Sequence, residues 1–394
     1  MASGGLFVCG VEAMGRQPET AGPLRVGGQA VMEGVMMRSP RSLAVAVRRL
    51  DGRIVIREAA WRPLLPGVKP LRWPFFRGAL VLLESMANGI SALNFSARVA
   101  MADMEAAERA EKAEKAAAEP AAAGDGAGPP AQHPPAAALD LDDAAAETKS
   151  WTIWATVAFA LALAIGLFIA LPHMAVWLGS LVVGRELSVA DFAFHAIVGG
   201  VKMLVFIGYI GLISLMQDVR RVFMYHGAEH QSIYAYEAGG PLTVAAARQH
   251  QPLHPRCGTT FLIMVIALSI LVFALVFPGI VWLVGEPTGI GWVDHVIYIL
   301  IKLPLLLPIA GLAYEFQRLT SRFLHRRWAR ALAWPGMFIQ RLTTRPPSDD
   351  QLEVALASLH KTLWRERQAD AGGRTTVETY ADFDAVVQAL GRTG

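Results

Sequence analysis

The sequence predicts a mainly α-helical, polytopic membrane protein with a small α+β portion outside the membrane. Of its 394 residues, 54% are hydrophobic, and the apolar residues are concentrated in long runs. Four runs contain the ~20 apolar residues that a helix needs to cross the hydrocarbon core of a bilayer. They lie at 151–178, 192–216, 261–284 and 293–314.

The N-terminal part of the chain predicts a small soluble unit. Residues 1–24 form an N-terminal extension without the apolar core of a signal peptide. Residues 25–73 are expected to contain β-structure, because 43–47 and 53–57, rich in Val and Ile with Arg between the runs, flank the turn Asp51-Gly52. This pattern is typical of a β-hairpin.

A long helix is expected to follow over 74–118. Arg77, Glu84 and Asn88 interrupt its apolar half, and charge inside hydrocarbon is unfavourable. We therefore expect an interfacial or re-entrant helix rather than a fifth span. Residues 119–147 are Ala, Pro, Gly and Asp with almost no bulky apolar side chain, which indicates a disordered linker.

The rest of the chain divides into three predicted regions. The transmembrane domain covers 148–316 and includes a loop with a metal-binding motif at 217–260. A helical tail follows at 317–369, in which Ser348-Asp349-Asp350 is a helix N-terminus. Residues 370–394 form a C-terminal extension to which we assign no pattern.

Charge in the loops orients the spans. Arginines are abundant in 217–257 and after residue 314, whereas 179–191 and 285–292 carry only Arg185. The positive-inside rule then places the metal-motif loop and both termini in the cytoplasm, with the spans in the cytoplasmic membrane. The two cysteines, Cys9 and Cys257, fit a reducing compartment.

The charge content of the chain also limits the classes of partner that we expect. A net charge of +3 gives no case for nucleic-acid binding. Membrane lipids are expected partners, and Arg38, Arg48 and Arg49 are expected to face acidic headgroups. The soluble unit and the tail helix together offer a docking platform for a cytoplasmic protein, and the sequence does not indicate an oligomeric state.

A metal-binding motif lies at 226–230. His226 and His230 are four residues apart, so on a helix their imidazoles reach the same ion, and Glu229 stands beside them. H-x-x-E-H is the inverted zincin pattern, in which two histidines hold Zn²⁺ and the glutamate is the general base.

A third ligand must come from elsewhere. His254 and Cys257 are candidates, with Glu237 and His250 as further options. A catalytic zinc site has three protein ligands and an open position, whereas a structural site closes with four. We assign a divalent metal, zinc in the first instance, to His226, His230, His254 and Cys257, and the catalytic role to Glu229.

Two functions fit this reading. One is a membrane-embedded zinc-dependent hydrolase whose site faces the cytoplasm. The alternative is a non-enzymatic membrane protein, either a metal or ion transporter or a scaffold with a structural metal site. For transport, Lys202 and Lys302 each follow a histidine by seven residues near mid-membrane, and charge at that depth is a hypothesis of function. The favoured alternative is that these lysines snorkel or pair with neighbouring groups.

Several motifs occur together in a familiar order. The runs GGQAVMEGVMMR at 27–38, YHGAEHQ at 225–231, HPRCGTTF at 254–261 and QRLTTRPP at 340–347 resemble the hallmarks of the bacterial DUF1385 family. The resemblance covers about 25–100 and 150–363. It implies a membrane protein described as a predicted metal-dependent enzyme, and it implies no substrate.

Overall fold

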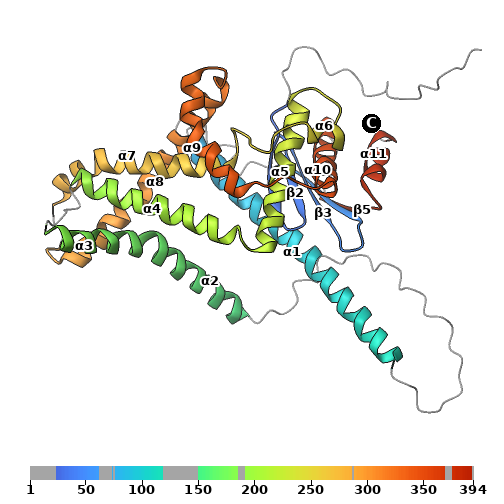
Figure 1. The fold of residues 1–394 in the computed structure, drawn as a ribbon, viewed down its shortest axis with the longest axis horizontal. Coiled ribbons are helices and arrows are strands. Elements are labelled where there is room, and N and C mark those ends of the chain that lie inside the picture. Colours follow the sequence, from blue (N-terminus) through green and yellow to red (C-terminus); the bar gives the residue numbers. More distant parts are fainter. Residues whose placement is uncertain are drawn as a thin grey trace, which may run out of the picture.

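The computed structural model describes residues 24–61, 73, 76–118, 150–184, 191–285, 288–368 and 375–392. The linker predicted at 119–147 and all but the last residue of the predicted N-terminal extension lie outside these ranges. Figure 1 shows a bundle of long helices on the left and a small sheet wrapped by helices on the right. We call these parts the membrane bundle (α2, η2, α3, α4, α7 and α8) and the sheet unit (β1–β5, α1, α5, α10 and α11).

The sheet is an antiparallel meander in the order β1-β2-β3-β4-β5. The predicted hairpin is confirmed, because β3 and β4 pair in antiparallel register around Asp51-Gly52. The fifth strand comes from the C-terminal extension, for which we predicted no strand, and it pairs with β4. The strands are β1 Gly27–Val31, β2 Gly34–Arg38, β3 Ser42–Arg48, β4 Ile54–Ala60 and β5 Thr376–Tyr380.

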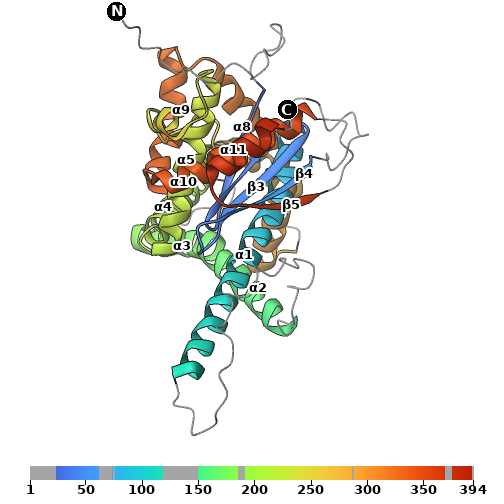
Figure 2. The ribbon, with the colours of Figure 1, turned by 90° about the vertical axis from the view of Figure 1, so that its right-hand side faces the viewer.

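Helices cover both faces of the sheet. Alternate residues of β3 point to opposite sides, so Val45 packs with Phe95 of α1 (Phe76–Ala118), whereas Ala46 packs with Leu356 of α10 (Asp349–Arg367). The helix α5 (Gln217–Glu237) shares the second face. Figure 2 shows α1 behind the sheet and α10 and α11 (Phe383–Arg392) in front of it.

The helix α1 also joins the sheet unit to the membrane bundle. Near its start, Arg77 forms a bidentate ion pair with Glu315 of α8. One residue later, a Cβ at Gly78 would stand 2.6 Å from Tyr314 Cβ. The backbone of α1 therefore contacts the Tyr314 side chain of α8 directly. Among the described residues α1 is not one of the candidate spans. Its interfacial position remains a prediction.

Four helical segments are long and apolar enough to cross a membrane, which confirms the predicted number of spans. The first includes a π-helical turn, and the last continues past residue 314 to Arg322. The segments are Ala158–Val182, Phe192–Ile213, Gly258–Val284 and Val296–Arg322. They belong to α2 Ser150–Ile165, η2 Gly166–Ala170 and α3 Leu171–Val183, then to α4 Phe192–Ile213, α7 Gly258–Val284 and α8 Gly291–Arg322.

The sheet unit lies at one end of the bundle. There α4 leads into α5, α7 begins at Gly258, and α8 ends at Arg322 (Figure 1). Two further helices, α6 (Val244–Arg248) and α9 (Arg327–Thr343), complete the connections at this end. The junction between bundle and sheet unit therefore contains every element that carries the metal motif.

Candidate metal centre

Helix α5 brings the two motif histidines together. His226 and His230 are one helical turn apart, and their ring centroids are 4.4 Å from each other. The helix can present both rings inward because Gly227 lies against the carbonyl of Arg345, where a Cβ has no room. Arg345 N–H donates to Phe223 O at 2.9 Å, which fixes the segment after α9 against α5.

Cys257 completes a group of three. It is the N-cap residue of α7, and its sulfur accepts a hydrogen bond from Thr259 N–H at 3.4 Å. His226 Nε2 lies 3.2 Å from Cys257 Sγ. One ligand atom from each of His226, His230 and Cys257 lies within 4.8 Å of the other two. Donors around one tetrahedral zinc stand about 3.5 Å apart, so a small inward shift of the side chains would suffice.

Hydrogen bonds orient both imidazoles for coordination. His226 Nδ1 lies 2.8 Å from Thr343 O, and His230 Nδ1 lies 2.6 Å from Pro252 O. A carbonyl only accepts, so each Nδ1 carries a proton, and Nε2 is the atom of each ring that can bind a metal once it carries no proton. His230 Nε2 is buried and makes no hydrogen bond within the described residues. A metal ion would satisfy this atom, and a carbonyl on the other nitrogen is the usual support of a metal-bound histidine.

The electrostatics of the group favour a thiolate. Burial alone would raise the pKa of Cys257, but His226 and His230 outweigh it and hold that pKa well below its ordinary value. Burial opposes the charged form of His226, yet the Cys257 thiolate raises its pKa to about 9. The thiolate is the form of cysteine that binds metals.

Glu229 lies beside this group on the strand side of α5. The carboxylate is buried, and burial raises its pKa to about 8, against the opposing effects of His226 and the Ala30 N–H. Gly28 of β1 lets the strand approach, because a Cβ there would stand 2.7 Å from Glu229 Cγ. Glu229 Oε2 has no hydrogen-bond partner within the described residues, so one oxygen is free to take a proton.

His254 lies next to the group of three but is not part of it. Its ring is 5.5 Å from that of His230, centroid to centroid, and its Nε2 lies 3.6 Å from Glu237 Oε2. Its Nδ1 accepts from Arg256 N–H at 3.3 Å, so both nitrogens have neighbours other than the group. Burial lowers the pKa of His254 to about 4. The ring of His250, another candidate, stacks on Tyr234.

The loop that carries Cys257 is fixed by two glutamines that sequence reasoning missed. Gln340 of α9 accepts from His254 N–H at 2.8 Å and donates to His254 O at 2.7 Å. Gln317 of α8 donates to the carbonyls of Pro255 and Cys257. An isolated glutamine carries no chemical signature, so its role is visible only where its amide meets the backbone.

One of the two intramembrane lysines, Lys302, packs against aromatic rings. Lys302 Nζ lies 4.3 Å from the ring centroid of Phe277, which is a favourable cation–π distance. His195 packs edge-on against the same ring, at 5.4 Å between centroids. The side chain of His295 lies outside the described part of the chain. These contacts are structural and give no support of their own to transport.

Together the fold and the site define a class: a multi-pass helical membrane protein whose His226, His230 and Cys257 could hold a metal ion where bundle and sheet unit meet. Comparison with known families agrees with the motifs. The chain belongs to the DUF1385 family, described as "Protein of unknown function (DUF1385)", whose profile matches residues 73–365.

The chain is also similar to the uncharacterized protein YqhQ of Bacillus subtilis (strain 168). The two are 29% identical over 343 residues, which is 86% of this chain and 93% of that protein. No solved structure matches the chain.

Proposed function

We propose that this protein is a zinc-dependent hydrolase of the bacterial inner membrane, with its site on the cytoplasmic face. The observation that supports this most strongly is the triad of donors: one ligand atom from each of His226, His230 and Cys257 lies within 4.8 Å of the other two. Three protein donors leave a fourth position for water, as in catalytic zinc sites. When bound, zinc acidifies that water towards a pKa of ~7.

The residues of the chain have separate roles in this proposal. His226, His230 and Cys257 hold the ion. Glu229 receives the proton of the attacking water at its free Oε2 and passes it to the leaving group. Gly28 and the Ala30 N–H position that carboxylate. His226 is partly exposed, whereas His230 and Cys257 are buried, so substrate would approach the ion from the side of His226.

The position of the site suggests the kind of substrate. The donors lie at the entrance of α7 and on α5, directly beyond the ends of the candidate spans. Arg220, Arg221, Arg248 and Arg256 share this side of the membrane, which supports a cytoplasmic orientation. A peptide or lipid presented at the membrane surface would reach such a site.

A structural metal site is the second candidate. The donors come from α5 of the sheet unit and from the N-cap of α7 in the bundle. An ion held between them would fasten the two parts together without turnover. This alternative uses the same three ligands and gives Glu229 no role.

Metal content tests the site directly. The protein is purified in detergent, and bound metals are measured by mass spectrometry in the wild type and in His226→Ala, His230→Ala and Cys257→Ala. We expect roughly one zinc per chain in the wild type and a loss of most of it in each variant. His254→Ala is the matched control and should retain its zinc. Unchanged metal content in all three ligand variants would refute the site.

A further inference from the structure

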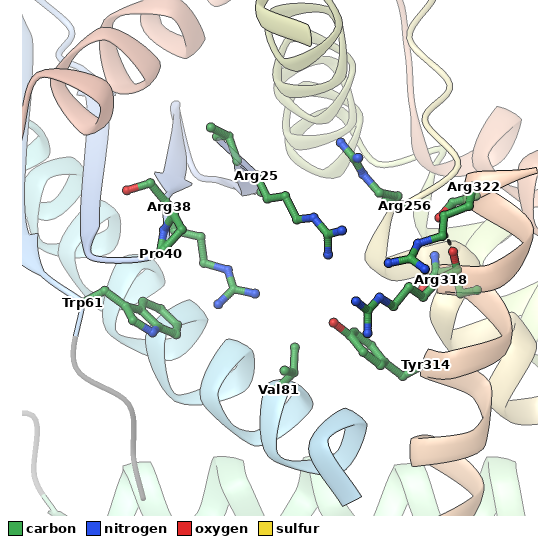
Figure 3. A pocket seen from close by; sticks show the side chains of 14 residues that line it. Arg25, Arg38, Pro40, Trp61, Val81, Arg256, Tyr314, Arg318 and Arg322 are labelled. Atoms are coloured by element: carbon green, nitrogen blue, oxygen red, sulfur yellow. Dashed lines mark hydrogen bonds between the residues drawn. The ribbon is translucent and has the colours of Figure 1, made fainter. Parts of the chain in front are cut away.

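A cavity of about 520 Å³ lies beside the metal centre, between β1, β2, α1, the loop before α7 and the end of α8. Its volume is within the range of small-molecule sites. Figure 3 shows arginine side chains reaching into it from several elements. They are Arg25, Arg38, Arg256, Arg318 and Arg322.

The cavity has a strong charge imbalance. Among the described residues, five arginines line it and no aspartate or glutamate does. Arg256 is paired with Glu237. The other four make no salt bridge within the described part of the chain, although buried Glu84 acts on Arg38 from a distance. Arg318 Nε is buried and has no hydrogen-bond partner there.

Two other arginines of the sheet unit do form salt bridges, so unpaired arginines are a feature of the cavity and not of every described arginine. Arg48 pairs with Glu353 at 2.6 Å, and Arg49 pairs with Asp103 at the same distance. We expected Arg48 and Arg49 to face acidic lipid headgroups. In the structure, carboxylates of the protein itself neutralise the charges of both residues. Arg38 is different: its guanidinium stacks on Trp61, 4.6 Å from the ring centroid, and faces the cavity.

We propose that this cavity binds a phosphate-bearing group. Guanidinium groups match phosphate oxygens in bidentate geometry, which is why arginine dominates such sites. Several cations around one cavity favour a ligand with more than one negative charge over a single carboxylate. Trp61, Val81 and Tyr314 give the cavity an apolar side for the organic part of the ligand.

Two sources could supply this chemistry, the headgroup of an anionic lipid or a soluble phosphorylated compound. The place favours the lipid. Arg318 and Arg322 are in the last turns of α8, at the end of the candidate span Val296–Arg322. The cavity therefore lies where a helix leaves the hydrocarbon and meets the phosphate layer of the bilayer. The proposal does not depend on the metal centre.

The test measures binding by the full chain in two arms. In one arm, inorganic pyrophosphate is titrated onto the protein in detergent. In the other, the protein is placed in phosphatidylcholine nanodiscs with or without phosphatidic acid, and retained lipid is counted by native mass spectrometry. Saturable binding in either arm is expected, and the arm in which it occurs identifies the source. Absence of saturable binding in both arms would overturn the proposal.

Paired variants separate a built site from diffuse charge. We expect Arg318→Gln with Arg322→Gln to weaken binding by about tenfold or more. Arg326→Gln with Arg327→Gln removes the same charge from two exposed arginines outside the cavity and should leave binding unchanged. Equal losses in both pairs would show diffuse attraction only and would refute the cavity. Arg25→Gln, on an exposed residue before β1, gives the same comparison should the α8 pair fail to fold.

Binding is also measured in His226→Ala. Because none of the three metal donors lines the cavity, we expect this variant to bind the phosphate probe as the wild type does. Loss of zinc without loss of the phosphate probe, or the reverse, distinguishes failure of the proposed hydrolase from failure of the proposed anion site.

Discussion

Gly28 of the edge strand lies directly against the side chain of Glu229, so that a Cβ at Gly28 would stand 2.7 Å from Glu229 Cγ and 2.9 Å from its Oε1. The contact joins the first motif of the chain to the H-x-x-E-H motif almost 200 residues later. It explains why a strand at the sheet edge contains a glycine, which otherwise weakens a strand. It also leads to a direct test.

Gly28→Ala is expected to destabilise the protein, because the new methyl group must displace the buried Glu229 side chain. Overpacking of this kind costs about 1–3 kcal/mol. Gly27→Ala is the matched control, since a Cβ there would meet only Arg38 Nε at 3.8 Å. Thermal unfolding in detergent should show a lower midpoint for Gly28→Ala alone. Equal midpoints for the two variants would contradict the packing described here.

Glu229→Gln separates catalysis from structure. The amide keeps the shape of the side chain but cannot act as a base, and loss of a general base slows such reactions by about 100-fold or more. We expect this variant to keep its zinc and fail to restore the phenotype of a deletion strain. Glu105→Gln, on the exposed part of α1, should restore it fully. Full restoration by Glu229→Gln would favour the structural metal site.

Gln340→Ala should weaken zinc binding without touching a ligand. The change removes the amide that holds both backbone groups of His254, and with it the anchor of the segment that leads to Cys257. Loss of outer support of this kind lowers metal affinity by about 10–100-fold. Competition with a chelator measures the effect. Gln249→Ala, an exposed residue after α6, should bind zinc as the wild type does.

Lys361→Met tests how the fifth strand is held. Lys361 is buried, and its Nζ lies 2.7 Å from Glu378 of β5 and 3.7 Å from Glu58 of β4. Removing one partner of a buried ion pair costs about 3 kcal/mol, which corresponds to amide exchange about 100-fold faster in Thr376–Tyr380.

Lys112→Met removes an exposed pair with Glu108 on α1, and such pairs contribute under about 1 kcal/mol. Exchange in β5 should therefore stay at the wild-type rate in this control. Slow exchange in the Lys361→Met variant would show that backbone pairing alone holds the strand.

Features that depend on short-range patterns could be predicted from the amino-acid sequence. The length of the apolar runs predicted the four spans, because a membrane-spanning helix must match the thickness of the hydrocarbon core. Two runs rich in Val and Ile and the Asp51-Gly52 turn predicted the β3–β4 hairpin. Four-residue spacing placed His226 and His230 on one helical face, since neighbours along a helix turn are fixed by its geometry.

Which distant groups meet could be seen only in the folded chain. The fold groups Cys257 with the two histidines and sets His254 against Glu237. It separates them in this way although His254 and Cys257 lie in the same short loop before α7. It brings arginines from four separate segments around one cavity and adds β5 to the sheet. Contacts of this kind depend on how helices and strands pack across long sequence separations, and no local periodicity or spacing records that packing.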